Sequence, residues 1–242
     1  MKPIVFLTST LKLYEKDENG NKIPINFGNE NQILDNLKKH IKKYDNFLFV
    51  ASNETNTEAT DKYASLTFAS FDLTLPFKNY QILDIRTEEK VEELIKEADL
   101  IMLSGGYLPY QNAFFNKINL RNIICNTNGV IMGGSAGTMN CADIVYVAPE
   151  LEGESIDPHF EKYKPGLGLT KINILPHYNV FKDYVLDNKK YIEEIIVPES
   201  YEREIIALED GSYYLLENST ETLFGEAYKI KDGEIVKIIG KK

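Results

Sequence analysis

The chain has 242 residues, of which 43% are hydrophobic and 26% charged, a composition typical of a folded globular protein with a sizeable core. Its 37 acidic residues outnumber its 27 basic residues and give a formal net charge of −10. This acidic balance argues against nucleic acid or an anionic membrane as the main partner.

Strand-like and helix-like patterns alternate over the first two thirds of the chain. Short apolar runs predict strands at 3–8, 47–51, 80–85, 100–103 and 129–132. Apolar residues at helical spacing predict helices at 31–43, 58–73 and 87–98, the last with Thr87 as its N-cap. Strands that are apolar throughout and alternate with helices indicate a parallel sheet covered on both faces.

The pattern changes after about residue 204. Short strands are predicted at 205–208, 213–216, 222–230 and 235–239, with Asp-Gly pairs at 210–211 and 232–233 between them. Because Asp-Gly pairs favour hairpin turns, we expect an antiparallel appendage. We interpret 1–242 as a single α/β domain with a C-terminal β-hairpin region from about residue 205.

The stretch Gly133-Gly134-Ser135-Ala136-Gly137 follows an apolar strand and precedes a helical pattern. It fits the G-x-S-x-G nucleophile elbow, in which small neighbours let strand and helix approach closely around a serine in a strained turn. The N–H of Ala136 can donate to an oxyanion there. The motif predicts Ser135 as a nucleophile with half of an oxyanion hole beside it.

A serine needs a base to take its proton, and the chain has three histidines. His177 follows the apolar segment 172–176, so a strand end could bring it to the elbow. His159, in the long irregular segment 149–168, is the rival base, and His40 is expected on a solvated helix face. Spacing does not choose the acid that orients the base among Asp143, Glu150, Glu152, Glu154, Asp157 and Glu161.

A second glycine-rich turn, Ser104-Gly105-Gly106-Tyr107, follows the predicted strand at 100–103. Two glycines let the backbone approach a ligand closely and leave an N–H free to point at it. We therefore expect this loop to supply the second oxyanion donor.

Together, Ser-Gly-Gly at 104–106, Gly-Gly-Ser-Ala-Gly at 133–137 and Leu-Pro-His-Tyr-Asn at 175–179 resemble the peptidase E group of serine peptidases, peptidase family S51, over about residues 1–216. The resemblance implies a class I glutamine-amidotransferase-like fold. That fold is a three-layer, doubly wound, mostly parallel α/β sheet of flavodoxin-like type, here with C-terminal antiparallel hairpins. A related group in this family is the cyanophycinases.

The resemblance also implies a Ser-His-Asp/Glu triad. Its serine corresponds to Ser135 and its histidine to His177, and the acid about fifteen residues beyond the serine corresponds to Glu150, with Asp143 and Asp157 as alternatives. Gly106 and Ala136 would supply the oxyanion hole. The remaining positions expected at the substrate are Gly105, Tyr107 and Asn179.

Two departures from the family pattern concern the substrate. The family's Gly-Gly-Asn-Thr is Gly105-Gly106-Tyr107-Leu108 here, which keeps the glycines and changes the side chains. The segment 183–191 has Lys189 and Lys190 but lacks the arginine by which aspartate-specific members hold an acidic side chain. A lysine is a point charge and not a bidentate fork, so it replaces that arginine poorly.

From these residues we expect a serine exopeptidase that acts on dipeptides or short peptides without a metal or organic cofactor. Two alternatives are a cyanophycinase-like peptidase and a non-catalytic small-molecule-binding protein that retains the elbow. Cys125 and Cys141 are expected to be buried free thiols, and no apolar stretch is long enough for a membrane span or signal peptide. We therefore expect a cytoplasmic monomer or homodimer with no nucleic-acid or membrane partner.

Overall fold

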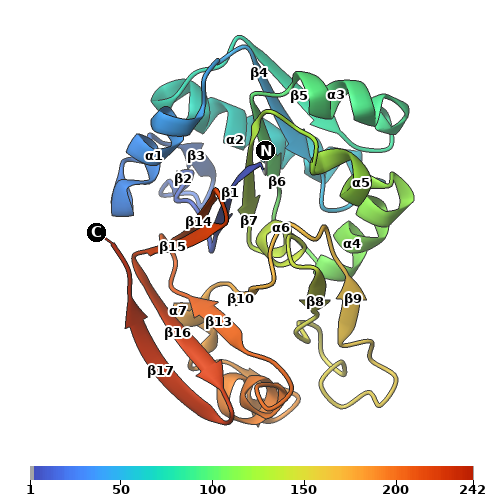
Figure 1. Ribbon diagram of the computed structural model, residues 1–242, viewed down its shortest axis with the longest axis vertical. Coiled ribbons are helices and arrows are strands. Elements are labelled where there is room, and N and C mark those ends of the chain that lie inside the picture. Colours follow the sequence, from blue (N-terminus) through green and yellow to red (C-terminus); the bar gives the residue numbers. More distant parts are fainter. Residues whose placement is uncertain (1–2, 242) are drawn as a thin grey trace.

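The computed structural model describes residues 3–241, and a seven-stranded sheet organises its larger part (Figure 1). Five of the strands are parallel neighbours, and they are, in sheet order, β1 (Ile4–Thr8), β7 (Val130–Gly134), β6 (Leu100–Leu103), β4 (Asn46–Val50) and β5 (Asn79–Leu83). Beyond β1 the sheet continues with two antiparallel strands, β14 (Tyr213–Glu217) and β15 (Thr220–Phe224). The expected mostly parallel α/β sheet is thus confirmed.

Helices cover both faces of this sheet because alternate side chains of each buried strand point to opposite faces. On one face Phe6 and Met132 pack with residues of α1 (Ile33–His40) and α2 (Thr57–Thr74). On the other face the neighbouring Val5 and Ile131 pack with the helices that follow β5 and β6. These helices are α3 (Val91–Glu97), α4 (Leu108–Lys117) and α5 (Leu120–Ile124).

A second, four-stranded sheet lies below the first in the view of Figure 1 and carries most of the C-terminal strands. Its order is β10 (Asn173–Leu175), β13 (Ile205–Leu208), β16 (Glu226–Lys231) and β17 (Glu234–Ile239). β10 and β13 are parallel, whereas the other pairs are antiparallel. Its apolar residues pack with a π-helical segment, Tyr191–Ile196, which leads into α8 (Val197–Glu199).

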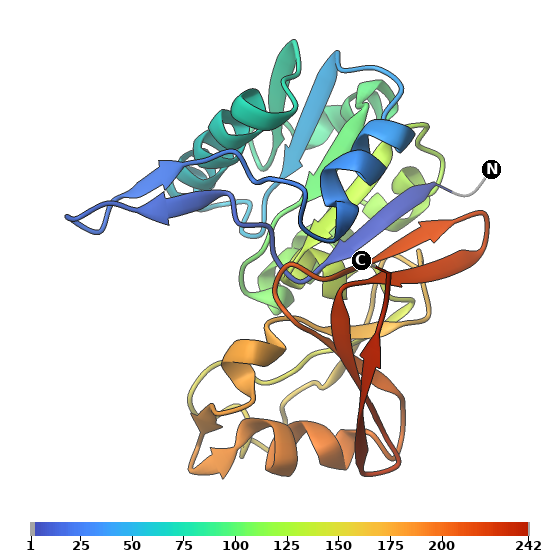
Figure 2. The same ribbon diagram turned by 90° about the vertical axis from the view of Figure 1, so that its left-hand side faces the viewer.

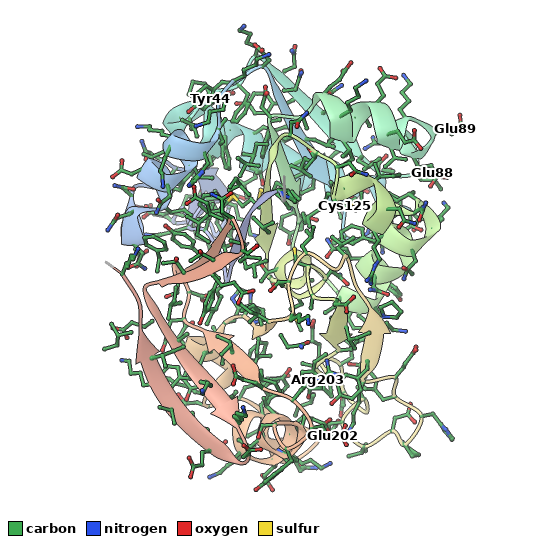
Figure 3. The ribbon with its side chains drawn as sticks, viewed as in Figure 1. Tyr44, Glu88, Glu89, Cys125, Glu202 and Arg203 are labelled. Atoms are coloured by element: carbon green, nitrogen blue, oxygen red, sulfur yellow. The ribbon has the colours of Figure 1, made fainter. Side chains whose placement is uncertain are left out.

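Short elements complete the fold. They are the pairs β2 (Tyr14–Lys16) with β3 (Lys22–Pro24), β8 (Ile144–Tyr146) with β9 (Tyr163–Pro165) and β11 (Val185–Leu186) with β12 (Lys189–Lys190), the helices α6 (Ala136–Met139) and α7 (Tyr178–Phe181), and 3-10 turns at Glu30–Gln32 and Glu88–Lys90. Figure 2 shows the β2–β3 hairpin projecting from the body of the molecule. Arg203 joins the β8–β9 pair to the chain after α8, because its guanidinium lies 4.4 Å from the ring centre of Tyr163 (Figure 3).

Two predictions about the C-terminal strands are wrong. The run 222–230 is divided at Gly225, whose φ of +87° and contact with Ser212 separate β15 in the large sheet from β16 in the small one. The Asp210–Gly211 turn is not a hairpin, because β13 and β14 belong to different sheets and do not pair. The turn instead passes the chain from the small sheet to the large one.

Three local predictions also need correction. His40 is buried, with 8% of its surface exposed, because α1 turns it toward Phe6. Cys141 is buried as expected, but Cys125, just after α5, is exposed (Figure 3). The hydroxyl of Thr87 donates to the carbonyl of Ile82 and makes no capping bond. Within residues 3–241, no helix has the length and apolar character needed to cross a membrane.

Candidate active site

Ser135 stands at the apex of a sharp turn between β7 and α6, with φ of 51° and ψ of −116°. A non-glycine residue rarely adopts such a conformation, and strained backbone of this kind is concentrated at functional sites. The glycines on both sides are required by close packing. A Cβ on Gly133 would lie 2.7 Å from the backbone N of Thr138, and one on Gly137 would lie 2.2 Å from the carbonyl O of Leu103. The turn therefore has the geometry of a nucleophile elbow.

His177 lies beside this serine, with Nε2 3.0 Å from Ser135 Oγ. It follows β10 and precedes α7, and its φ of 60° and ψ of 36° are left-handed. The strand that delivers it belongs to the four-stranded sheet, so the two side chains meet between two sheets and not along one sheet edge. The distance is that of a hydrogen bond, which a general base for a serine requires.

Asp210 occupies the other nitrogen of this imidazole, because His177 Nδ1 lies 2.7 Å from Asp210 Oδ1. Burial opposes ionisation of this carboxyl, but hydrogen bonds from His177 and Ser9 outweigh it and hold the pKa of Asp210 below its usual value. An ionised carboxylate on Nδ1 fixes the tautomer in which Nε2 is free to accept the serine proton.

Ser9, which follows β1 and is fully buried, connects all three of these residues. Its carbonyl oxygen accepts the N–H of Ser135 at 3.0 Å, and its hydroxyl accepts the N–H of His177 at 2.8 Å. The same hydroxyl donates to Asp210 Oδ1 at 2.8 Å. One residue thus ties the elbow of the large sheet to the base and the carboxylate that the small sheet delivers.

The loop after β6 runs directly against the elbow. A Cβ on Gly105 would lie 3.2 Å from Ser135 Cβ and 3.8 Å from Ser135 Oγ. Gly106 has a φ of +148°, and a Cβ there would lie 2.3 Å from Ser52 Oγ. Because Ala136 is the first residue of α6, that helix offers no acceptor for its N–H. Of the two candidate oxyanion donors, Ala136 thus follows the serine directly, and Gly106 follows Gly105 in a loop whose close contacts leave no room for a Cβ at Gly106.

The expectation that Glu150 orients the base is corrected, because Asp210 occupies that position. Glu150 lies in the loop after β8, where burial and the neighbouring Glu154 raise the pKa of its carboxyl to about 7, against an opposing effect of His177. The two alternative acids are engaged elsewhere: Asp143 pairs with Arg121, and Asp157 accepts the N–H of His159 at 2.8 Å. His159 itself is exposed, whereas His177 contacts Ser135.

The residues expected at the substrate have different surroundings. Gly105 and Tyr107 line the cavity beside Ser135, and the Tyr107 hydroxyl donates to Glu154. Asn179 instead accepts the backbone N–H of Asp210 at 3.1 Å, so it supports the acid. The ammonium of Lys189 donates to the carbonyl of Ser155 at 3.1 Å, away from that cavity.

A cavity of about 500 Å³ opens beside Ser135 and His177. Its walls come from the ends of β1 and β6, the β2 end of the projecting hairpin, the first turns of α2 and the loops at 52–56 and 104–107. The volume is in the usual range for small-molecule sites. Within residues 3–241, no three His, Cys, Asp or Glu side chains gather as metal ligands would.

Sequence reasoning missed Asp210 and Ser9. Asp210 is the first residue of an Asp-Gly pair, which by itself indicates only a turn. It also lies beyond His177, whereas the candidate acids all lie between Ser135 and His177. Ser9 carries no local motif, since a serine after a strand is common. For Ser9 a signal was available, because the carboxyl ends of neighbouring parallel strands lie at the same edge of a sheet. β1 and β7 are such neighbours, so Ser9, after β1, lies beside Ser135, after β7.

Comparisons with known proteins concern the family and the fold. The model of peptidase family S51 matches residues 24–224. The crystal structure of a peptidase from an acI-B1 Actinobacterium is similar with a TM-score of 0.64 and 16% identity, covering 100% of this chain and 96% of that chain. The structure of a candidate peptidase E protein from Listeria monocytogenes EGD-e has a TM-score of 0.57 and 17% identity, covering 99% of each chain. At these identities the two likenesses concern the fold, and no curated protein sequence matches the chain.

Proposed function

The chain belongs to peptidase family S51, and from that premise we propose that it is a serine exopeptidase for dipeptides or other short peptides. Its triad is Ser135, His177 and Asp210. The observation that carries the proposal is the continuous contact from Asp210 Oδ1 to His177 Nδ1 at 2.7 Å and from His177 Nε2 to Ser135 Oγ at 3.0 Å. A serine on a strained turn with a base already in contact supports catalysis over mere ligand binding.

The reaction begins when Ser135 Oγ attacks the scissile carbonyl carbon and His177 Nε2 accepts the hydroxyl proton. Asp210 stabilises the imidazolium that forms. The N–H groups of Gly106 and Ala136 donate to the oxyanion, a contribution of roughly 3 kcal/mol per donor in related chemistry. His177 then protonates the leaving amine as the C–N bond breaks. Water then attacks the acyl carbon while His177 takes its proton, and as the bond to Ser135 Oγ breaks, His177 returns that proton to the serine and the acid product leaves.

The size of the site supports short substrates. A cavity of about 500 Å³ is of the size usual for small-molecule ligands, which suits a dipeptide or another short peptide. Cys125 and Cys141 are both free thiols, the first exposed and the second buried. This agrees with action in the cytoplasm, where thiols stay reduced.

A fluorophosphonate probe and a dipeptide panel test the proposal together. The wild-type protein is expected to react with the probe and to hydrolyse dipeptides, and Ser135→Ala is expected to lose both. His177→Ala should lose hydrolysis and label at least about 10³-fold more slowly, because the serine lacks its base. Wild-type hydrolysis by Ser135→Ala would exclude this serine as the nucleophile.

A further inference from the structure

The cavity beside Ser135 differs from the rest of this acidic protein in the residues that line it. Of the residues in the described range 3–241 that face it, none is Asp, Glu, Lys or Arg, and His177 of the proposed triad is the only histidine. The lining is made of aromatic and aliphatic side chains with hydroxyl and amide groups among them. Examples are Phe49, Leu66, Met102, Tyr110, Thr60 and Asn53.

A cation close to two of the lining residues is engaged by their rings. The ammonium of Lys22, on β3, lies 4.2 Å from the ring centre of Tyr14 and 4.7 Å from that of Tyr63. Both rings line the cavity, whereas Lys22 is not among the lining residues. Its charge is therefore held in cation–π contacts with these two rings.

Tyr107 connects the cavity to two carboxyl groups. It lines the cavity, and its hydroxyl donates to Glu154, whose other oxygen accepts the N–H groups of Glu150 at 2.7 Å and Leu151 at 2.9 Å. The carboxyl of Glu150 is close enough to influence both His177 and Tyr107 electrostatically. An anionic side chain that entered the cavity would find acidic groups beyond Tyr107 and no cation among the lining residues.

We propose that this cavity binds an uncharged side chain next to the scissile bond, with preference for aromatic and branched aliphatic residues, and discriminates against aspartate and glutamate. The proposal rests on the proposed peptidase function of the same site. Burying a carboxylate without a cationic partner is costly, whereas rings and aliphatic groups lose only contact with water. The hydroxyl and amide groups of the lining can also satisfy a neutral polar side chain such as asparagine.

Dipeptides that differ only in charge test this directly. We expect kcat/KM for Asn-Ala to exceed that for Asp-Ala by about tenfold or more, with Leu-Ala and Phe-Ala higher still. If the cavity binds the side chain on the other side of the scissile bond, the Ala-X series shows this order instead. Asn and Asp have the same shape, so their ratio reports charge alone. Equal or better hydrolysis of the aspartate peptide in both series would overturn the proposal.

A single added cation should reverse the preference. Ala59 lies on α2, is half-buried and lines the cavity, so Ala59→Arg places a guanidinium within it. This variant is expected to raise the Asp/Asn ratio of kcat/KM by about tenfold, since a carboxylate then finds a bidentate partner. Ala59→Met controls for the added length. Ser65→Arg, on the same helix but exposed, controls for the added charge and should leave the ratio unchanged.

The fluorophosphonate probe separates failure of this inference from failure of the peptidase proposal. Labelling that depends on Ser135 and His177, combined with an aspartate preference, would overturn the neutral cavity and leave the serine mechanism intact. Loss of both labelling and hydrolysis from the wild-type protein would overturn the mechanism itself. A ratio that stays unchanged in Ala59→Arg, while the variant remains folded and is labelled at the wild-type rate, would also contradict the cavity as the place of discrimination.

Discussion

The two halves of the proposed catalytic site differ in how the sequence marks them. Ser135 and the Gly105–Gly106 turn each follow a strand of the seven-stranded sheet, and each lies in a short glycine-containing motif. His177 and Asp210 follow β10 and β13 of the four-stranded sheet and reach the serine only because the two sheets pack together. The comparison indicates that the proposed nucleophile has a local signature in the sequence, whereas the proposed base and acid reach it through contacts between distant segments.

The largest expected effect distinguishes the two carboxyl groups near His177. Asp210→Asn should lower kcat by about 10⁴-fold, because an amide on Nδ1 favours the wrong imidazole tautomer. Glu150→Gln should lower it by no more than about tenfold, since Asp210 still orients the base. Steady-state kinetics of the two variants provide the measurement. A larger loss in the Glu150 variant would return that residue to the role first expected of it.

The local half can be tested at Gly106. A methyl group there would meet Ser52 Oγ at 2.3 Å and Ser52 Cβ at 2.6 Å, at a φ of +148° that disfavours alanine. Gly106→Ala should displace one oxyanion donor and lower kcat by about 10²-fold, with little change in KM. Adding Ser52→Gly removes the contact and should restore part of the loss. An unchanged kcat in the single variant would show that this N–H does not serve the transition state.

Glu150 also predicts a pH-dependent stability. Its folded pKa of about 7 lies above the usual 4.5, so the folded state binds this proton more tightly than the unfolded state does. Ionisation of Glu150 therefore lowers the free energy of unfolding. This loss is absent below pH 4.5, grows as pH rises, and is complete above pH 7. Glu150→Gln should stabilise the protein by about 1–3 kcal/mol at pH 8 and by almost nothing at pH 4.

Urea unfolding at the two pH values measures this difference. Glu152→Gln makes the same chemical change at an exposed position of the same loop, and its free energy of unfolding should match that of the wild type at both pH values. A Glu150 variant that loses stability at pH 8 would mean that the carboxylate makes a favourable interaction in the folded state.

The smallest effect concerns the residue that joins the two halves. Ser9→Ala removes the hydroxyl between the His177 N–H and Asp210 Oδ1, and it should lower kcat by about tenfold while KM stays within about twofold. Ser70→Ala is the matched control, because it deletes another fully buried serine hydroxyl, bonded to the carbonyl of Ile25. Equal kinetics of the two variants would show that Ser9 is only structural.

Sequence reasoning succeeded where neighbouring residues determine the geometry. The predicted strand at 100–103 is β6, and the turn at 133–137 was found because its glycines and serine form a short continuous motif, although Gly137 is required by a contact with the distant Leu103. The same reasoning failed for His40, whose charged neighbours on α1 suggested solvent, because the packing of that helix on Phe6 was not contained in the local pattern.

Asp210 shows the physical limit most clearly. An Asp-Gly pair has the same local preference for a turn whether the flanking strands pair with each other or diverge. Here β13 pairs with β10 and β16, whereas β14 pairs with β1 and β15, and only these long-range choices bring the carboxylate to His177. No residue near position 210 indicates that β13 and β14 diverge. The family's spacing between serine and acid pointed to Glu150 instead.

The hydrogen bond between Ser9 and Asp210 joins residues 201 positions apart. β1 also pairs with β14, which is synthesised near the end of the chain. During synthesis, a ribosome-bound chain can complete the elbow and the oxyanion turn long before the residues after 204 emerge. On the proposed mechanism, such a nascent chain holds its nucleophile without the acid that orients the base. The order of translation would then act as a built-in delay, by which hydrolysis begins only once the C-terminal strands have folded onto the first one.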